Sequence, residues 1–106
     1  MLNVRVWNYG NYSSNNYGSC RAVTIGDLIL YYSYNTVVAF RDGNKPLVIS
    51  QNIWSNTTGR HLNWINPDKT VRIPNDEFED TLSRTLRQYK LEKVGLCEQY
   101  NIAVGA

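Results

Sequence analysis

Residues 54–65, WSNTTGRHLNWI, hold several side chains whose types could do chemistry, among them the single histidine of the sequence, His61. A histidine acts as a general base when a nucleophile and an orienting carboxylate stand beside it. Asp68 is near in sequence, but no spacing requires it as a partner. The chain has no nucleophile elbow, no H-E-x-x-H motif and no P-loop. We therefore expect no catalytic residue, and a structural or hydrogen-bonding role for His61.

The same stretch could instead bind an anion. Arg60 and His61, close to the start of a helix and beside two threonines, would form a cradle for phosphate. Tryptophans can stack on bases, although beside a sheet they more often pack in a core or an interface. We expect Trp54 in the core and Trp64 towards an edge. The candidate binding residues are Thr57, Thr58, Arg60, His61, Trp64 and, further along the chain, Arg72.

Length and composition restrict the classes of protein that this chain can be. The 106 residues fit one domain, residues 1–106, with a single core. The formal net charge of +2 is too small to indicate nucleic-acid binding by itself. Two cysteines and one histidine fall short of the four ligands of a zinc site, so we expect no metal and no cofactor. Cys20 and Cys97 are expected to be free thiols in a reducing compartment, with a disulfide as the alternative.

The N-terminus, MLNVRVWN, has the features of neither a signal peptide nor a transit peptide. No apolar run approaches the roughly 18 residues of a membrane span. We expect an intracellular protein that does not associate with a membrane.

Alternation and β-branched residues predict an antiparallel meander of about four to five strands. The expected strands are residues 2–7, 21–25, 28–34, 36–41 and 46–51. Gly26 and the triplet Asp42-Gly43-Asn44 mark turns between them. The strands are apolar at nearly every position, so we expect both faces of the sheet to be covered. Helices would cover one face. The other face would be covered by the Tyr-rich loop 8–19, by a partner, or by a second copy in a homodimer.

Two helices complete a predicted α+β fold. A short helix at about 56–65 would begin at Ser55, with Thr57 as the alternative cap, and end before Pro67. An amphipathic helix at about 75–91 would begin at Asn75. Its apolar stripe is Phe78, Leu82, Leu86 and Tyr89. The tail 96–104 alternates again and is expected to return as a strand beside residues 2–7.

Three segments carry a resemblance to a known family: YSYNTVVA at 32–39, VISQNIWS at 48–55 and TTGRHLN at 57–63. Together they resemble a family of small, uncharacterised domains found in bacteriophages, archaeal viruses and their hosts. The resemblance covers roughly residues 28–82 and leaves 1–25 and 92–106 outside. It implies a viral or mobile-element origin and an α+β fold. Because no reaction is assigned to that family, it implies no catalytic residue.

Three functions remain open on these grounds. The leading hypothesis is a small non-enzymatic accessory protein of a virus or mobile element, in the host cytoplasm, that binds a macromolecule; inhibition of a host defence complex is one concrete form. The first alternative is a nucleic-acid-binding module that uses Arg60, His61, Arg72 and neighbouring aromatic residues. The second alternative is a small hydrolase or nuclease built around His61.

Overall fold

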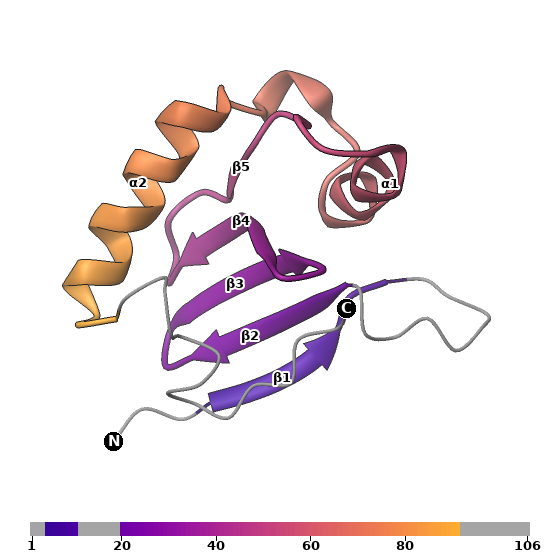
Figure 1. Ribbon diagram of the computed structural model, residues 1–106. Coiled ribbons are helices and arrows are strands. Elements are labelled where there is room, and N and C mark those ends of the chain that lie inside the picture. The colour runs from indigo at the N-terminus through magenta and orange to yellow at the C-terminus, as the bar shows by residue number, and fades with distance from the viewer. Residues whose placement is uncertain (1–3, 11–19, 92–106) are drawn as a thin grey trace.

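The computed structural model describes residues 4–10 and 20–91. They form one antiparallel sheet in the order β1-β2-β3-β4-β5, with two α-helices and a short 3-10 helix, which confirms the predicted α+β fold (Figure 1). The strands are β1 Val4–Asn8, β2 Arg21–Ile25, β3 Leu28–Ser33, β4 Thr36–Asp42 and β5 Val48–Ile49. The helices are α1 Asn56–Ile65, η2 Lys69–Val71 and α2 Asn75–Gln88.

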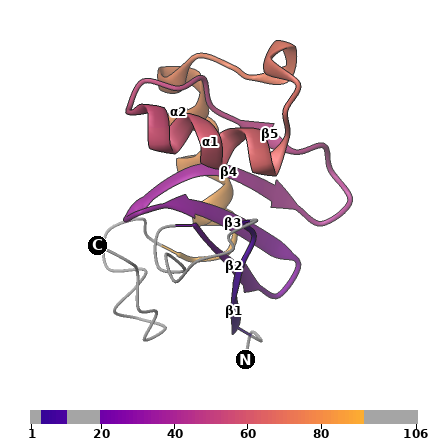
Figure 2. The ribbon, with the colours of Figure 1, turned by 90° about the vertical axis from the view of Figure 1, so that its right-hand side faces the viewer.

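Each face of the sheet has a helix of its own, because two apolar clusters lie on opposite sides of β4. Phe40 belongs to the cluster that contains Phe78 and Leu82 of α2. Ala39 belongs to the cluster that contains Leu62 of α1. Figure 2 shows α1 in front of the sheet and α2 behind it. The expectation that helices cover only one face is therefore wrong.

A bulge in the β3–β4 pair sets which residues face α1. Tyr31 pairs with Ala39, but Tyr32 pairs with Val37, so Val38 is the extra residue of β4. Val38 and Ala39 are both buried in the α1 cluster, although they are consecutive in sequence. Beyond the bulge, Ser33 reaches the α1 side of the sheet, where its hydroxyl contacts the helix.

Several predicted boundaries need correction. The fifth strand is only Val48–Ile49. Ser50 still donates its N–H to the Val38 carbonyl of β4 at 3.0 Å, and it also forms a parallel bridge with Ile73. Asn75 is not the N-cap of α2: Pro74 holds that position without a side-chain bond, and Asn75 Nδ2 donates to Ser50 Oγ at 3.2 Å. The N-terminal strand extends to Asn8, one residue beyond its predicted end, whereas residues 2 and 3 of the prediction lie outside the described residues.

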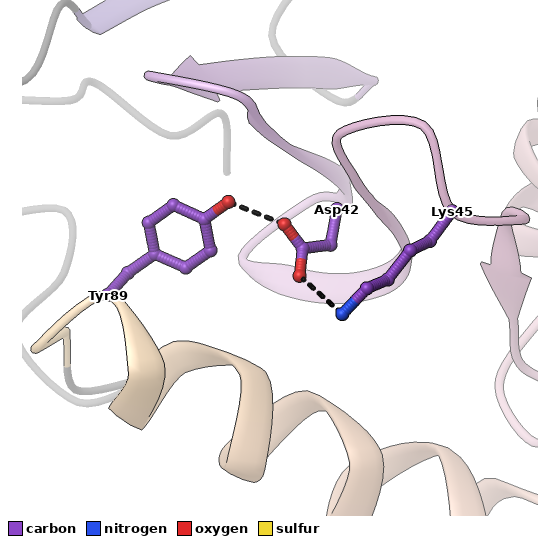
Figure 3. Close-up of polar contacts among 3 residues, drawn as sticks. All are labelled: Asp42, Lys45 and Tyr89. Carbon is purple, nitrogen blue, oxygen red and sulfur yellow. Dashed lines mark hydrogen bonds and ion pairs between the residues drawn. The ribbon is translucent and has the colours of Figure 1, made fainter.

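The second helix ends at Gln88, earlier than predicted, and is tied down at its end. Lys90 takes a left-handed conformation with φ 58°, which stops the helix. Tyr89, predicted as part of the apolar stripe, donates its hydroxyl to Asp42 Oδ1 at 2.5 Å, and Asp42 also pairs with Lys45 (Figure 3). The expected final strand at 96–104 and residues 11–19 of the expected loop 8–19 lie outside the described residues, and Asn8 belongs to β1.

Candidate functional site

The turn into α1 explains why this helix tolerates residues of low helix propensity. Ser55 is its N-cap, as predicted, and the Ser55 hydroxyl accepts from the Thr58 N–H at 3.2 Å. Asn52 closes the preceding turn: its Oδ1 accepts from the Trp54 N–H at 3.0 Å and its Nδ2 donates to the Ser55 carbonyl at 3.0 Å. A Cβ at Gly59 would lie 3.1 Å from Asn52 Nδ2. The glycine therefore leaves room for the turn to pack on the helix.

A buried polar network joins α1 to the sheet. Ser33 Oγ lies 2.7 Å from His61 Nδ1 and 2.9 Å from Thr58 Oγ1. All three side chains are buried, and His61 is fully so. Burial, and secondly the charge of Arg60, lower the pKa of His61, so the imidazole is neutral at physiological pH. This network supports the predicted hydrogen-bonding role of the histidine.

Aromatic rings surround His61 on its remaining sides. The ring centroids of Trp64 and Tyr34 lie 5.6 Å and 5.7 Å from that of the imidazole, and Tyr9 lies at 6.4 Å. Trp64 is half-buried, as expected for an edge position. Trp54 is also half-buried, and it packs against the α1 cluster without being enclosed in it.

The carboxylate and the thiol that could assist a catalytic His61, those of Asp68 and Cys20, have hydrogen-bond partners of their own. Asp68 accepts from the N–H and the hydroxyl of Thr70, at 2.9 Å and 2.6 Å, which lowers its pKa. Cys20 Sγ donates to Asn8 Oδ1 at 3.1 Å. Cys97 is outside the described residues. Among residues 4–10 and 20–91, no group of three His, Cys, Asp or Glu side chains could hold a metal ion.

The opposite side of α1 lines an open, polar groove of about 290 Å³. We call it the α1 groove; its lining residues are Asn52, Asn56, Gly59, Arg60, Asn63, Lys69 and Arg72. No carboxylate is among them. In the described parts of the chain, the ion pairs are Asp42–Lys45 and Asp80–Arg84, so the cations of the α1 groove pair with no acid.

Arg72 is held in the α1 groove by one terminal nitrogen. Its Nη2 donates to Asn63 Oδ1 at 2.9 Å and to the Asn66 carbonyl at 3.4 Å. Its Nε is buried and has no hydrogen-bond partner within the described residues. A buried donor without a partner is costly. Within residues 4–10 and 20–91, no group accepts a hydrogen bond from this guanidinium N–H.

The structure divides the predicted binding residues between two sides of α1. Arg60 and Arg72 meet in the α1 groove. Thr58 and His61 are instead buried against β3, and Trp64 contacts His61. Thr57 is half-buried and precedes His61 by four residues, which places it on the stripe of His61 and Trp64.

The sequence analysis did not identify Ser33, Lys69 or the asparagines as residues of this site. Ser33 was read only as part of an aromatic strand. Lys69 was overlooked because it belongs to a three-residue 3-10 helix that carries no periodic signal. The asparagines of the α1 groove could have been found from their spacing, since Asn56 and Asn63 are seven residues apart and share one face of a helix.

No helix in the described residues is long and apolar enough to cross a membrane. A model of a family of unknown function (DUF8033) matches residues 3–80. This match begins nearer the N-terminus than the resemblance at about 28–82 and includes residues 3–25, which were expected to lie outside. No curated protein and no solved structure gives a match.

Proposed function

This chain belongs to that family of unknown function, and we propose that it is a non-enzymatic module that binds nucleic acid along the α1 groove. The observation that carries the proposal is the set of three cations, Arg60, Lys69 and Arg72, that line one groove without a carboxylate. Arginine, lysine and asparagine side chains supply many of the protein contacts to phosphate oxygens.

The distribution of charge supports this assignment more than the net charge does. The first turns of α2 carry a cluster of acidic residues on the other side of the sheet: Asp76, Glu77, Glu79 and Asp80. The segment that contains α1 and η2 carries the three cations of the α1 groove. The acidic residue of this segment, Asp68, accepts hydrogen bonds from Thr70. Although the net charge is only +2, the face that carries the α1 groove is therefore basic and attracts a polyanion.

The proposed contact is with the phosphate backbone and so is weakly dependent on sequence. Each phosphate neutralised by a cation releases counterions, which makes affinity fall with salt. Three cations predict a slope of log K against log salt of about 2 to 3 in magnitude. A module of this kind suits an accessory protein of a virus or mobile element, which the resemblance to phage and archaeal-virus domains supports.

A protein partner is the second candidate, and two exposed apolar side chains favour it. Ile53 is 60% exposed and Val71 is 44% exposed. Each belongs to one of the two segments that border the α1 groove, beside Asn52 and Arg72 respectively. Exposed apolar side chains favour contact with another protein, for example a subunit of a host defence complex. Binding of this kind would depend weakly on salt.

The case for a homodimer now depends on the edge strand. Both faces of the sheet carry a helix, so apolar strands alone no longer require a second copy. Val6 on β1 is 43% exposed, and β1 is the first strand in the order of the sheet. An edge strand of this kind can pair with its own copy. Light scattering coupled to size-exclusion chromatography tests the dimer, and a Val6→Lys substitution should abolish it.

The experiment that tests the proposed function is a fluorescence-anisotropy titration against labelled short DNA and RNA, single- and double-stranded. Arg60→Ala and Lys69→Ala are the clean substitutions, because both residues are exposed and neither side chain holds the fold. Arg87→Ala is the matched control: it is also an exposed helical arginine, but on α2. We expect weaker binding for both groove variants and native binding for the control. Equal affinities for all variants would overturn the assignment.

A further inference from the structure

A second cavity lies on the sheet side of the start of α1, and we propose that it binds a nucleobase from a single strand. This inference rests on the proposed function, since the backbone of that strand would follow the α1 groove. The cavity measures about 210 Å³ and opens to solvent. We call it the hydroxyl pocket; its lining residues are Ser33, Tyr34, Thr36, Val38, Trp54, Ser55 and Thr58.

The chemistry of the lining residues selects a neutral planar ligand. Two aromatic side chains, Tyr34 and Trp54, provide surfaces on which a base can stack. The polar groups are hydroxyls, which both donate and accept. Those of Ser33, Ser55 and Thr58 already bond within the protein, so Tyr34 and Thr36 would meet the edge of a base. No charged side chain lines the pocket, so a phosphate or a carboxylate has no cation to pair with there. The volume is below the roughly 300–1,000 Å³ of sites for drug-sized ligands and suits one ring-sized group.

The backbone at Tyr34 is a second observation that favours a site. Tyr34 is the first residue of the two-residue turn between β3 and β4, and its φ is 54°. Glycine and asparagine adopt this left-handed conformation readily, whereas a tyrosine is strained in it. Tyr34 is nevertheless 38% exposed, although its ring also lies beside His61. A strained, exposed aromatic residue that lines a pocket indicates that its ring is used there.

The hydroxyl pocket and the α1 groove share one wall. Ser55 lines the pocket, whereas its neighbours Asn52 and Asn56 line the groove. Within this wall, Asn52 Nδ2 donates a hydrogen bond to the Ser55 carbonyl at 3.0 Å. A base in the pocket and its phosphate in the groove would therefore lie on either side of a single turn of chain. A duplex keeps its bases stacked inside, so this arrangement selects a single strand.

The test compares the full chain with Tyr34→Gly, Tyr34→Phe and Trp54→Phe for binding to a single-stranded oligonucleotide and to an abasic oligonucleotide of the same length. Phenylalanine keeps the ring at position 34, whereas glycine removes the ring and the strain. We expect Tyr34→Gly to lose about five- to a hundredfold in affinity for the normal strand, as expected for one lost base stack. Tyr34→Phe should bind like the native chain. The thermal midpoint of Tyr34→Gly should equal or exceed that of the native chain.

Adenosine monophosphate provides a readout that does not need the α1 groove to hold a long strand. We expect it to quench tryptophan fluorescence in the native chain and less in Trp54→Phe. If neither oligonucleotide binds but the mononucleotide still quenches Trp54, the proposed function fails and the pocket stands. If the abasic strand binds as tightly as the normal strand, and Tyr34→Gly changes neither affinity, the pocket assignment is overturned while the groove stands. Equal quenching by glucose would also overturn it.

Discussion

Ser33 Oγ and His61 Nδ1 are 2.7 Å apart at the buried junction of β3 and α1, and the same hydroxyl lies 2.9 Å from Thr58 Oγ1. One serine thus links the sheet to two residues of the helix that borders the α1 groove and the hydroxyl pocket. The network explains why the chain places polar side chains between two apolar layers. It also separates His61, which holds the fold, from Arg60, which faces solvent.

Ser33→Ala removes both hydrogen bonds and leaves the imidazole nitrogen of His61 without this partner. A buried group that loses its hydrogen-bond partner costs about 1–3 kcal/mol of stability. We expect the free energy of unfolding in urea to fall by that amount. Ser83→Ala on the exposed face of α2 is the matched control and should change stability by less than about 0.5 kcal/mol. A native midpoint for Ser33→Ala would show that the network adds nothing to stability.

His61→Ala and Arg60→Ala should behave oppositely, although the residues are adjacent. His61 is fully buried, so its truncation leaves a cavity and removes the hydrogen bond to Ser33 Oγ, and it should cost about 2–4 kcal/mol. Arg60 is exposed, so its truncation should cost less than about 0.5 kcal/mol. Urea unfolding followed by circular dichroism measures both. Similar losses of stability in the two variants would contradict the division of α1 into a structural and a binding side.

Acid should weaken the fold through His61. Burial lowers the folded-state pKa of this histidine below its ordinary value of 6.5, so the unfolded state binds the proton more readily. The contribution of His61 is complete above pH 6.5 and is lost as the pH falls from 6.5 towards the lowered folded-state pKa. The measurement is the urea midpoint across this range. The urea midpoint of His61→Gln should depend less steeply on pH than that of the native protein. Equal dependence on pH in the two proteins would contradict the prediction.

High pH should lower the stability of the fold by weakening the contact of Tyr89, at the end of α2, with Asp42. Its hydrogen bond to Asp42, assisted by burial, raises the pKa of the phenol from 10.0 to about 12. Since the folded-state pKa is the higher one, this contribution is complete below pH 10 and is lost as the pH rises towards 12. Tyr89→Phe should cost about 1 kcal/mol at neutral pH and should show a weaker loss of stability above pH 10. Unchanged stability in both ranges would mean that the bond in Figure 3 does not anchor α2.

Gly59 and Asn52 should be energetically coupled. Alanine in place of glycine inside a helix gains up to about 1 kcal/mol, but its Cβ would lie 3.1 Å from Asn52 Nδ2. We expect Gly59→Ala to stabilise the chain more in an Asn52→Ala background than in the native one. A double-mutant cycle on the urea midpoints measures the difference. Equal gains in both backgrounds would show that the glycine is not required by the turn.

Local sequence patterns predicted much of the fold. Alternation, β-branched residues and turn glycines located the strands, and the Ser55 cap fixed the start of α1. Asn75 shows the limit of this reasoning: it is a good cap by type, but its side chain bonds to Ser50 from a distant segment. The assignment of each helix to its own face could not be read from periodicity, because the strands are apolar on both sides.

The site was harder to predict than the fold for a physical reason. Arg60 and His61 are neighbours in sequence, yet a helix turns about 100° per residue and sends them to different surroundings. Ser33 became a partner of His61 only because the bulge at Tyr31 and Tyr32 sets the register of the β3–β4 end. Lys69 joins the α1 groove through a turn of the chain that has no sequence signature.

The most direct test of the central claim is the salt dependence of binding to a single-stranded oligonucleotide, measured by anisotropy for the native chain, Arg60→Ala and Arg87→Ala. If the α1 groove holds phosphates, the native slope of log K against log salt is about 2 to 3 in magnitude. Arg60→Ala should lower that slope by about 0.7, and Arg87→Ala should leave it unchanged. Binding that does not vary with salt, or a slope that Arg60→Ala leaves at its native value, would contradict the claim and direct the search to a protein partner.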